Sequence, residues 1–178
     1  MRRAPPKPGL VIWITGLSGS GKSTVSALVV EQLRASKIPV VLLDGDVVRE
    51  VLGGDLGYSR NDRIENAFRI CRLARLFSQQ GLTVVCATMS LFKQCHAWNR
   101  EHLQRYLEVL LDVPLEELRR RDPKGLYRKV AGGHASGVAG VDQEYDLPVK
   151  PHLRIRNLIP MTASSAARKI LAAARRSC

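Results

Sequence analysis

A glycine-rich turn between a strand-like and a helix-like segment constrains this chain more than any other feature. Residues 16–24 read GLSGSGKST, after the apolar run Leu10–Thr15 and before the helical spacing of Thr24–Ala35. Glycines here let backbone N–H groups curl round an anion, and the start of the next helix adds its positive dipole end. The G-x-x-x-x-G-K-[ST] pattern predicts a nucleoside triphosphate site, with Lys22 reaching the β- and γ-phosphates and the Ser23 hydroxyl holding Mg²⁺.

Strand-like and helix-like segments alternate along the chain, which is typical of a parallel sheet covered by helices. We expect an α/β fold in three layers with a central parallel β-sheet of about five strands. The strands are expected at Leu10–Thr15, Pro39–Leu43, Leu82–Ala87, Tyr106–Val113 and Leu153–Ile155. The helices are expected at Thr24–Ala35, Asp46–Leu52, Asp62–Gln80, Leu115–Arg121 and Ser164–Arg175. Residues 1–178 then form a single domain, with a flexible N-terminal extension over 1–9 and a mobile, glycine-rich lid over 124–151.

The net charge of +12 over 178 residues favours anionic partners. One basic run spans the start of the lid and is expected to face phosphate: Arg119, Arg120, Arg121, Lys124, Arg128 and Lys129. A second basic set near the C-terminus, Arg168, Lys169, Arg175 and Arg176, is expected to be a solvated face.

The cysteines and the lengths of the apolar runs indicate the cellular compartment of the protein. Cys71, Cys86, Cys95 and Cys178 lack metal-binding spacing, and Cys71 and Cys86 lie in apolar stretches, so we expect buried, reduced thiols and a cytoplasmic location. The apolar run after Arg2 and Arg3 is too short for a secretion signal, and no segment approaches membrane-spanning length. We expect a soluble protein that acts on a small-molecule nucleotide and has no membrane or nucleic-acid partner. The sequence leaves open whether it forms a homodimer.

Two carboxylates follow the second expected strand, in the stretch Leu43-Asp44-Gly45-Asp46. In open parallel sheets the carboxyl ends of the strands border the ligand crevice. Asp44 or Asp46 can therefore hold Mg²⁺ through water or accept a proton from an attacking hydroxyl, although either can instead simply cap the following helix. Arg63 and Asn66 share a helix face, and a guanidinium beside an amide suits a phosphate or sulfate group.

The chain resembles the adenylyl-sulfate kinases (APS kinases) over essentially its whole length. The resemblance lies in GLSGSGKST at 16–24, LDGDVVR at 43–49, LGYSRNDRIEN at 56–66 and RDPKGLY at 121–127, with Gly-Val-Asp at 140–142. It implies a P-loop kinase fold. It also implies transfer of the γ-phosphate of ATP, with Mg²⁺, to the 3′-hydroxyl of adenosine 5′-phosphosulfate, which gives the sulfate donor PAPS for sulfate assimilation.

The resemblance implies roles for residues by their positions. The ATP site would comprise Gly16, Ser18, Gly19, Ser20, Gly21, Lys22, Ser23 and Thr24, with Arg121 and Lys124 from the lid side. Lys22, Asp44, Asp46 and Ser90 would form the catalytic set, in which Asp46 orients or deprotonates the acceptor and Ser90 matches a serine that some members phosphorylate. The acceptor site would comprise Asp46, Arg49, Tyr58, Arg63, Asn66, Phe92 and Val138, with Tyr58 stacking on the acceptor base.

The sequence departs from the family on the acceptor side. The lid usually reads Lys-Asn-Phe-Thr-Gly, whereas residues 136–140 read SGVAG, so a lysine and a stacking aromatic are missing and Val138 stands in the aromatic's place. Base stacking is worth about 1–3 kcal/mol per base. Phe92 either supplies stacking instead or is a core residue.

Two alternatives therefore stay open. A divergent branch of the family shares the lid valine and the stretch Trp98-Asn99-Arg100. Some of its members are linked to bacterial capsule pathways and act on cytidine 5′-diphosphoramidate. A non-catalytic, basic P-loop protein that binds RNA or a partner is the alternative of another class.

Overall fold

The computed structural model describes residues 6–134 and 137–176. Within these residues, five strands form one sheet in the order β2-β3-β1-β4-β5, with every pairing parallel. The strands are β1 (Val11–Thr15), β2 (Val40–Asp44), β3 (Thr83–Ala87), β4 (Tyr106–Asp112) and β5 (Leu153–Arg156). The helices are α1 (Lys22–Ala35), α2 (Gly45–Leu52), α3 (Arg60–Gln79), α4 (Lys93–His102), α5 (Leu115–Arg121), α6 (Leu126–Ala131) and α7 (Ala163–Arg176).

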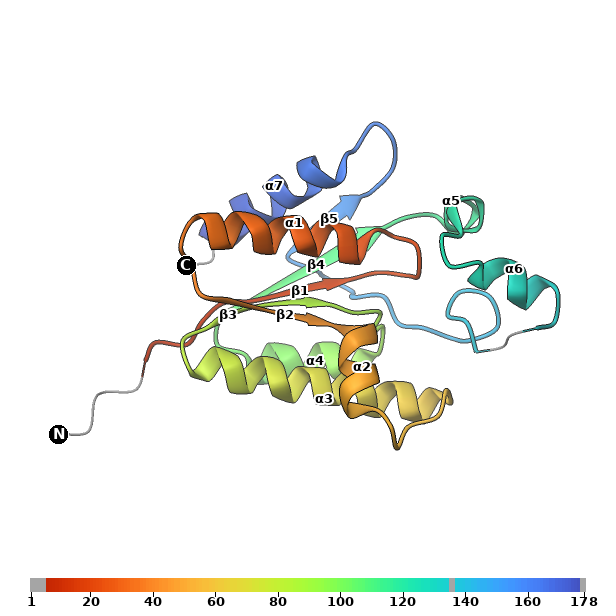
Figure 1. Cartoon of the computed structure of the whole chain (residues 1–178), viewed down its shortest axis with the longest axis horizontal. Helices are drawn as coiled ribbons and strands as arrows, with labels where there is room; N and C mark the ends of the chain where they lie inside the picture. Colours follow the sequence, from red (N-terminus) through yellow and green to blue (C-terminus); the bar gives the residue numbers. More distant parts are fainter. Residues whose placement is uncertain (1–5, 135–136, 177–178) are drawn as a thin grey trace.

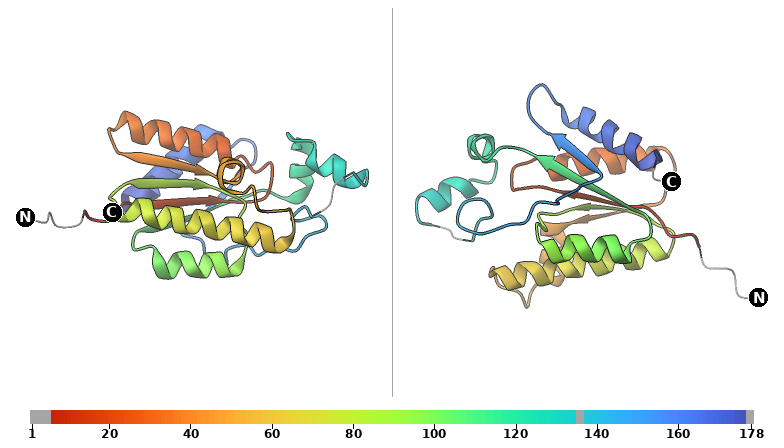
Figure 2. Two further views of the ribbon diagram at one scale, coloured as in Figure 1. Left: turned by 60° about the horizontal axis from the view of Figure 1, so that its bottom comes forward. Right: turned by 180° about the vertical axis from the view of Figure 1, so that it is seen from behind.

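Helices cover both faces of the sheet (Figure 1). α1 and α7 pack together on one face, and α3 and α4 on the other, as Figure 2 shows from two further sides. α5 and α6 lie beyond the carboxyl ends of the strands, next to the turn that follows β1. The expected three-layer α/β P-loop fold with a parallel sheet is confirmed.

The central strand β1 is buried on both faces, which explains its continuous apolar run. Ile12 and Ile14 join the apolar cluster under α1 and α7, and Val11 and Trp13 join the cluster under α3 and α4. Because β1 has β3 on one side and β4 on the other, the turn after Thr15 emerges at the middle of the carboxyl edge of the sheet.

Two helices lie where the sequence analysis predicted none. α4 occupies the unassigned stretch after β3 and begins without a side-chain cap. α6 lies inside the expected lid and has six residues, too few to show a periodicity. The long helix α3 begins at Arg60 rather than Asp62, because the side chains and backbone N–H groups of Ser59 and Asp62 form a capping box.

The cysteines and the C-terminal basic set lie as expected. Cys71, Cys86 and Cys95 are buried free thiols, and burial raises the pKa of Cys86 well above its usual range. Cys178 lies outside the described residues. Arg168, Lys169, Arg175 and Arg176 are exposed. None of the helices described in the structure is long and apolar enough to cross a membrane.

The N-terminal extension expected over 1–9 is held in place at its end. Gly9 is buried and its N–H donates to the Ser78 carbonyl at 2.8 Å, while Arg105 donates to the Pro8 carbonyl at 3.3 Å. Residues 1–5 lie outside the described residues.

Gly9→Ala is expected to destabilise the fold. A Cβ at this position would lie 1.9 Å from the Leu82 carbonyl oxygen, a backbone atom that cannot move without disturbing β3. Overpacking of this kind costs about 1–3 kcal/mol, which thermal unfolding would report as a lower Tm. Gly54→Ala is the matched control, because a Cβ there meets nothing within 4 Å. Equal Tm values for the two variants would contradict this packing.

Candidate active site

A cavity of about 670 Å³ opens at the carboxyl ends of the strands, between the turn after β1, helix α2 and the region of α6. It brings together most of the residues that the sequence analysis singled out. From the turn and α1 it is lined by Ser18, Gly19, Gly21, Lys22, Ser23 and Thr24. From the other elements it is lined by Asp44, Asp46, Arg49, Tyr58, Arg63, Asn66, Ser90, Phe92, Arg121 and Lys124.

The turn has the backbone of a phosphate loop. Gly19 and Gly21 have φ values of 79° and 92°, a region that residues with a Cβ rarely adopt. Lys22 begins α1, and its Nζ donates to the carbonyls of Gly16 at 2.8 Å and Leu17 at 2.9 Å. Its ammonium is therefore folded back against the loop, within reach of an anion at the start of the helix.

Burial lowers the pKa of Lys22 from 10.5 to about 8, against the opposing attraction of Asp46. We therefore expect Mg·ADP binding to weaken as the pH rises through about 8. Below that pH the free protein already carries the ammonium, whereas above it binding must take up a proton, which raises the Kd by up to about tenfold per pH unit. Calorimetric titration between about pH 7 and 9.5 measures this slope. Lys22→Ala, as the control, should bind weakly without the slope; the same slope in both proteins would contradict the assignment to Lys22.

Asp44 links the phosphate loop to α2. Its Oδ2 accepts from the Ser23 hydroxyl at 2.9 Å, and its Oδ1 accepts from the Asp46 N–H at 2.9 Å as the N-cap of α2. The helix-cap alternative is thus confirmed for Asp44, but the other oxygen remains directed at Ser23. Mg²⁺ prefers oxygen ligands and is usually held by one or two carboxylates together with substrate phosphates. Ser23 and Asp44 fit such an ion.

Asp46 is more exposed and pairs across the cavity. Its Oδ2 lies 2.5 Å from Lys124 Nζ, and both side chains are well exposed. Asp46 therefore joins the first turn of α2 to Lys124, which lies just before α6.

Arg49 and Arg63 lie against the Tyr58 ring in the part of the cavity where the acceptor is expected. Their guanidinium carbons lie 4.5 Å and 5.8 Å from the centre of the Tyr58 ring, and 73% of Tyr58 is exposed. Arg49 also donates to the Gly57 carbonyl, and Arg63 Nε donates to the Tyr58 carbonyl at 3.2 Å. The pair of cations and the exposed ring form a surface for a planar, negatively charged ligand.

Asn66, Ser90 and Phe92 line the deeper part of the cavity. The Asn66 Oδ1 is buried without a hydrogen-bond partner among the described residues, so it is free to accept from a ligand. Ser90 is buried with its Oγ 2.7 Å from the Thr88 hydroxyl. Phe92 packs in the apolar cluster under α3 and α4, which confirms the core alternative; it also lines the cavity, and stacking on a base stays a prediction.

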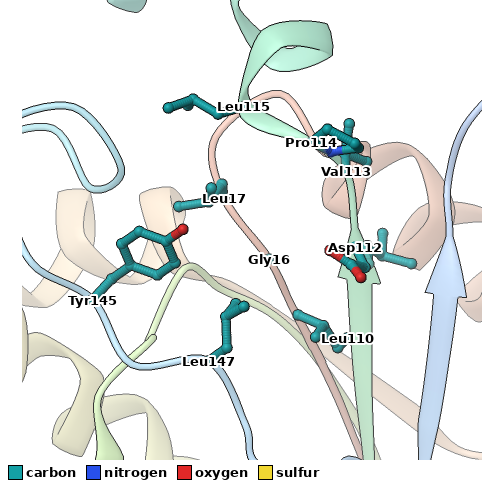
Figure 3. A pocket seen from close by; sticks show the side chains of 10 residues that line it. Gly16, Leu17, Leu110, Asp112, Val113, Pro114, Leu115, Tyr145 and Leu147 are labelled. Atoms are coloured by element: carbon teal, nitrogen blue, oxygen red, sulfur yellow. The ribbon is translucent and has the colours of Figure 1, made fainter.

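Three predicted residues do not line this cavity. Gly16 lies beside a separate cavity of about 140 Å³, between the end of β4 and the side chains of Tyr145 and Leu147 (Figure 3). Ser20 is fully buried behind the loop. Val138 is 3% exposed and packs in an apolar cluster with Leu17 and Leu118, so it does not replace a stacking aromatic.

The basic run from Arg119 to Lys129, which spans α5 and α6, faces the cavity only in part. Arg121 and Lys124 line the cavity, whereas Arg120 is paired outside it with Glu117 at 2.8 Å. Arg119, Arg128 and Lys129 do not line it. Consecutive residues of a helix point in different directions, so one run of charges cannot face a single ligand.

Sequence reasoning missed Thr88 and Tyr145, which also line the cavity. Thr88 comes directly after β3, and a polar residue at the carboxyl end of a strand is a signal that was available. Tyr145 lies in an irregular segment, where nothing local indicates which way the side chain points.

Proteins of known family are similar to this chain over most of its length. The family model for adenylylsulphate kinase matches residues 8–156. The chain belongs to the adenylyl-sulfate kinase family. It is 43% identical to the adenylyl-sulfate kinase of Pseudomonas aeruginosa over 150 residues, which cover 83% of this chain and 76% of that protein. It is 41% identical to an adenylyl-sulfate kinase of Synechococcus over 145 residues, covering 82% of this chain and 83% of that protein.

A solved structure of this family has the same fold. The APS kinase of Mycobacterium tuberculosis, in complex with AMPPNP and APS, is 36% identical and covers 96% of this chain and 99% of that chain, with a TM-score of 0.89. The family also occurs within larger proteins: the bifunctional enzyme NodQ of Rhizobium is 42% identical, but the match covers 23% of that protein.

Proposed function

We propose that this member of the adenylyl-sulfate kinase family transfers the γ-phosphate of ATP, with Mg²⁺, to the 3′-hydroxyl of adenosine 5′-phosphosulfate. The observation that carries this is a single cavity in which the phosphate loop faces Asp44 and Asp46, with Arg49, Arg63 and Asn66 beyond them. The M. tuberculosis relative was solved with an ATP analogue and APS together, and it matches nearly the whole chain.

The proposed roles follow from the geometry. Lys22 neutralises charge on the transferred phosphoryl group, and Ser23 with Asp44 would hold Mg²⁺, which supplies positive charge for the phosphates. Asp46 orients the acceptor hydroxyl and receives its proton. Arg49, Arg63 and Asn66 bind the sulfate and phosphate of the acceptor, and Tyr58 stacks on its base. Bond making is loose in phosphoryl transfer, so positioning and charge carry most of the catalysis.

A second candidate is the same transfer to another nucleotide, such as cytidine 5′-diphosphoramidate. The observation that favours it is the burial of Val138 in an apolar cluster, so the lid position that carries a stacking aromatic in the family supplies none here. The aromatic side chains that line the cavity are Tyr58, Phe92 and Tyr145. A site with less stacking on the acceptor base discriminates less strongly for a purine.

A panel of acceptors separates the two candidates. Purified protein with Mg·ATP is assayed for ADP formation and for a new phosphate monoester on adenosine 5′-phosphosulfate, cytidine 5′-diphosphoramidate and adenosine 5′-monophosphate. The highest kcat/KM with adenosine 5′-phosphosulfate supports the first candidate. Turnover of the cytidine nucleotide alone would overturn it in favour of the second.

Assembly and location belong to the same proposal. We propose a cytoplasmic enzyme that assembles as a homodimer and has small nucleotides as its ligands. Buried free thiols suit a reducing compartment. An APS kinase of Thiobacillus denitrificans is hexameric, so assembly occurs in the family. Sedimentation equilibrium tests the dimer; a monomer mass across the working concentration range would contradict it.

A further inference from the structure

The phosphate loop is held from behind by side chains from distant parts of the chain. A loop that turns its N–H groups toward an anion turns carbonyl groups outward, and buried carbonyls need donors. The Ser18 carbonyl accepts from the Tyr127 hydroxyl at 2.9 Å, and the Ser20 carbonyl accepts from Asn157 Nδ2 at 2.8 Å. Tyr127 lies in α6, and Asn157 comes directly after β5.

Lys22 also donates to carbonyls of the loop, but its role differs. Its Nζ contacts the carbonyls of Gly16 and Leu17. Under the proposed function this ammonium turns to the phosphates when ATP binds, so these contacts weaken at that point. The donors from Tyr127 and Asn157 lie outside the cavity and remain available while the nucleotide is bound.

Both donors are fixed by their surroundings. Tyr127 is 5% exposed, and its N–H donates to Asp122 Oδ1 at 3.1 Å. Asn157 is 8% exposed; its N–H donates to the Asp112 carbonyl at 3.2 Å, and its carbonyl accepts from Arg121 Nη2 at 2.9 Å. A Cβ at Gly21 would lie 2.8 Å from Asn157 Nδ2, so the amide sits directly against the loop.

We propose that Tyr127 and Asn157 are positioning residues that keep the phosphate loop in its polyphosphate-binding conformation. Neither touches the reacting atoms. The hydroxyl of Tyr127 connects α6 to the loop through the Ser18 carbonyl. Asn157 connects the loop to Arg121, because its amide donates to the Ser20 carbonyl and its own carbonyl accepts from Arg121. The inference rests on the proposed function only for the assignment of the loop to the ATP phosphates.

The test measures binding of inorganic tripolyphosphate with Mg²⁺ by calorimetry, because this probe needs the loop and neither the base nor the acceptor site. Tyr127→Phe and Asn157→Ala each remove one donor. We expect each variant to raise the Kd by about five- to tenfold, as loss of one hydrogen bond to a buried group predicts. In turnover assays the KM for ATP should rise by a similar factor, with little change in the KM for the acceptor.

Matched controls remove the same chemical groups elsewhere. Tyr106→Phe and Asn99→Ala act on a polar pair at the other end of β4, where Asn99 Nδ2 lies 3.4 Å from the Tyr106 hydroxyl. These variants should lower Tm while leaving the tripolyphosphate Kd within about twofold, because a general loss of stability does not reshape the loop.

Three outcomes overturn the inference. They are unchanged tripolyphosphate binding by folded Tyr127→Phe, an equal loss of binding in the controls, and no binding by the wild type. If Asn157→Ala fails to fold, Tyr127→Phe alone decides. Failure of the proposed function gives a different result. If the wild type does not turn over adenosine 5′-phosphosulfate, the proposed acceptor is wrong. If the variants still lose tripolyphosphate affinity in that case, the inference about the loop stands.

Discussion

Lys22→Ala is expected to lower kcat by about 10²–10³-fold, because it removes the positive charge that faces the transferred phosphoryl group. The Nζ of Lys22 is already within the phosphate loop, in contact with the carbonyls of Gly16 and Leu17. Lys22 contributes to the transition state as well as to nucleotide binding, so its loss lowers kcat in addition to weakening the affinity for the nucleotide. Steady-state kinetics at saturating Mg·ATP and acceptor measure the effect.

The control for this variant is Lys169→Ala, which removes an exposed lysine of α7 that does not line the cavity. It should keep kcat within about twofold of the wild type, as surface substitutions generally do. A Lys22→Ala protein that is folded and retains wild-type kcat would remove Lys22 from the mechanism.

Asp46→Asn is expected to lower kcat by about 100-fold or more while changing the KM for ATP by less than about threefold. The amide keeps the size of the side chain but can no longer receive the proton of the acceptor hydroxyl. Asp46 also pairs with Lys124, so part of any KM change reports the loss of that contact. The kcat ratio at saturating substrates isolates the catalytic part.

Two other carboxylates serve as comparisons for Asp46. Asp55→Asn breaks an exposed pair with Arg69, at 2.6 Å, away from the cavity and should leave kcat nearly unchanged. Asp44→Asn removes the carboxylate that accepts from Ser23, so it should raise the Mg²⁺ concentration needed for half-maximal rate. A loss of ATP affinity alone in Asp46→Asn would make Asp46 a nucleotide-positioning residue instead of a proton acceptor.

The sequence predicted those parts of the site that depend on local backbone chemistry. The spacing of the glycines and Lys22 is a local pattern that indicates a phosphate loop by itself, and Asp44 and Asp46 lie at the end of a strand whose carboxyl end must border the crevice. The sheet was predictable for the same reason, since alternating apolar strands and helices leave few ways to bury both faces.

The parts that depend on distant contacts were not predictable from the sequence. Tyr127 and Asn157 reach the phosphate loop from 109 and 137 residues away, and no local pattern records such a contact. Val138 was placed on the acceptor side by its position in the lid, but its apolar side chain packs with Leu17 and Leu118 instead. Burial of an apolar residue in a loop depends on which cluster lies beneath it, and this is set by the tertiary fold.

Phosphorus NMR of the reaction product shows which oxygen of the acceptor receives the phosphoryl group. The purified protein is incubated with Mg·ATP and adenosine 5′-phosphosulfate, and the nucleotide product is isolated. We expect one new phosphate monoester coupled to the 3′ position of the ribose, formed in equal amount to ADP. Release of inorganic phosphate with an unchanged acceptor, or a monoester at another oxygen, would contradict it.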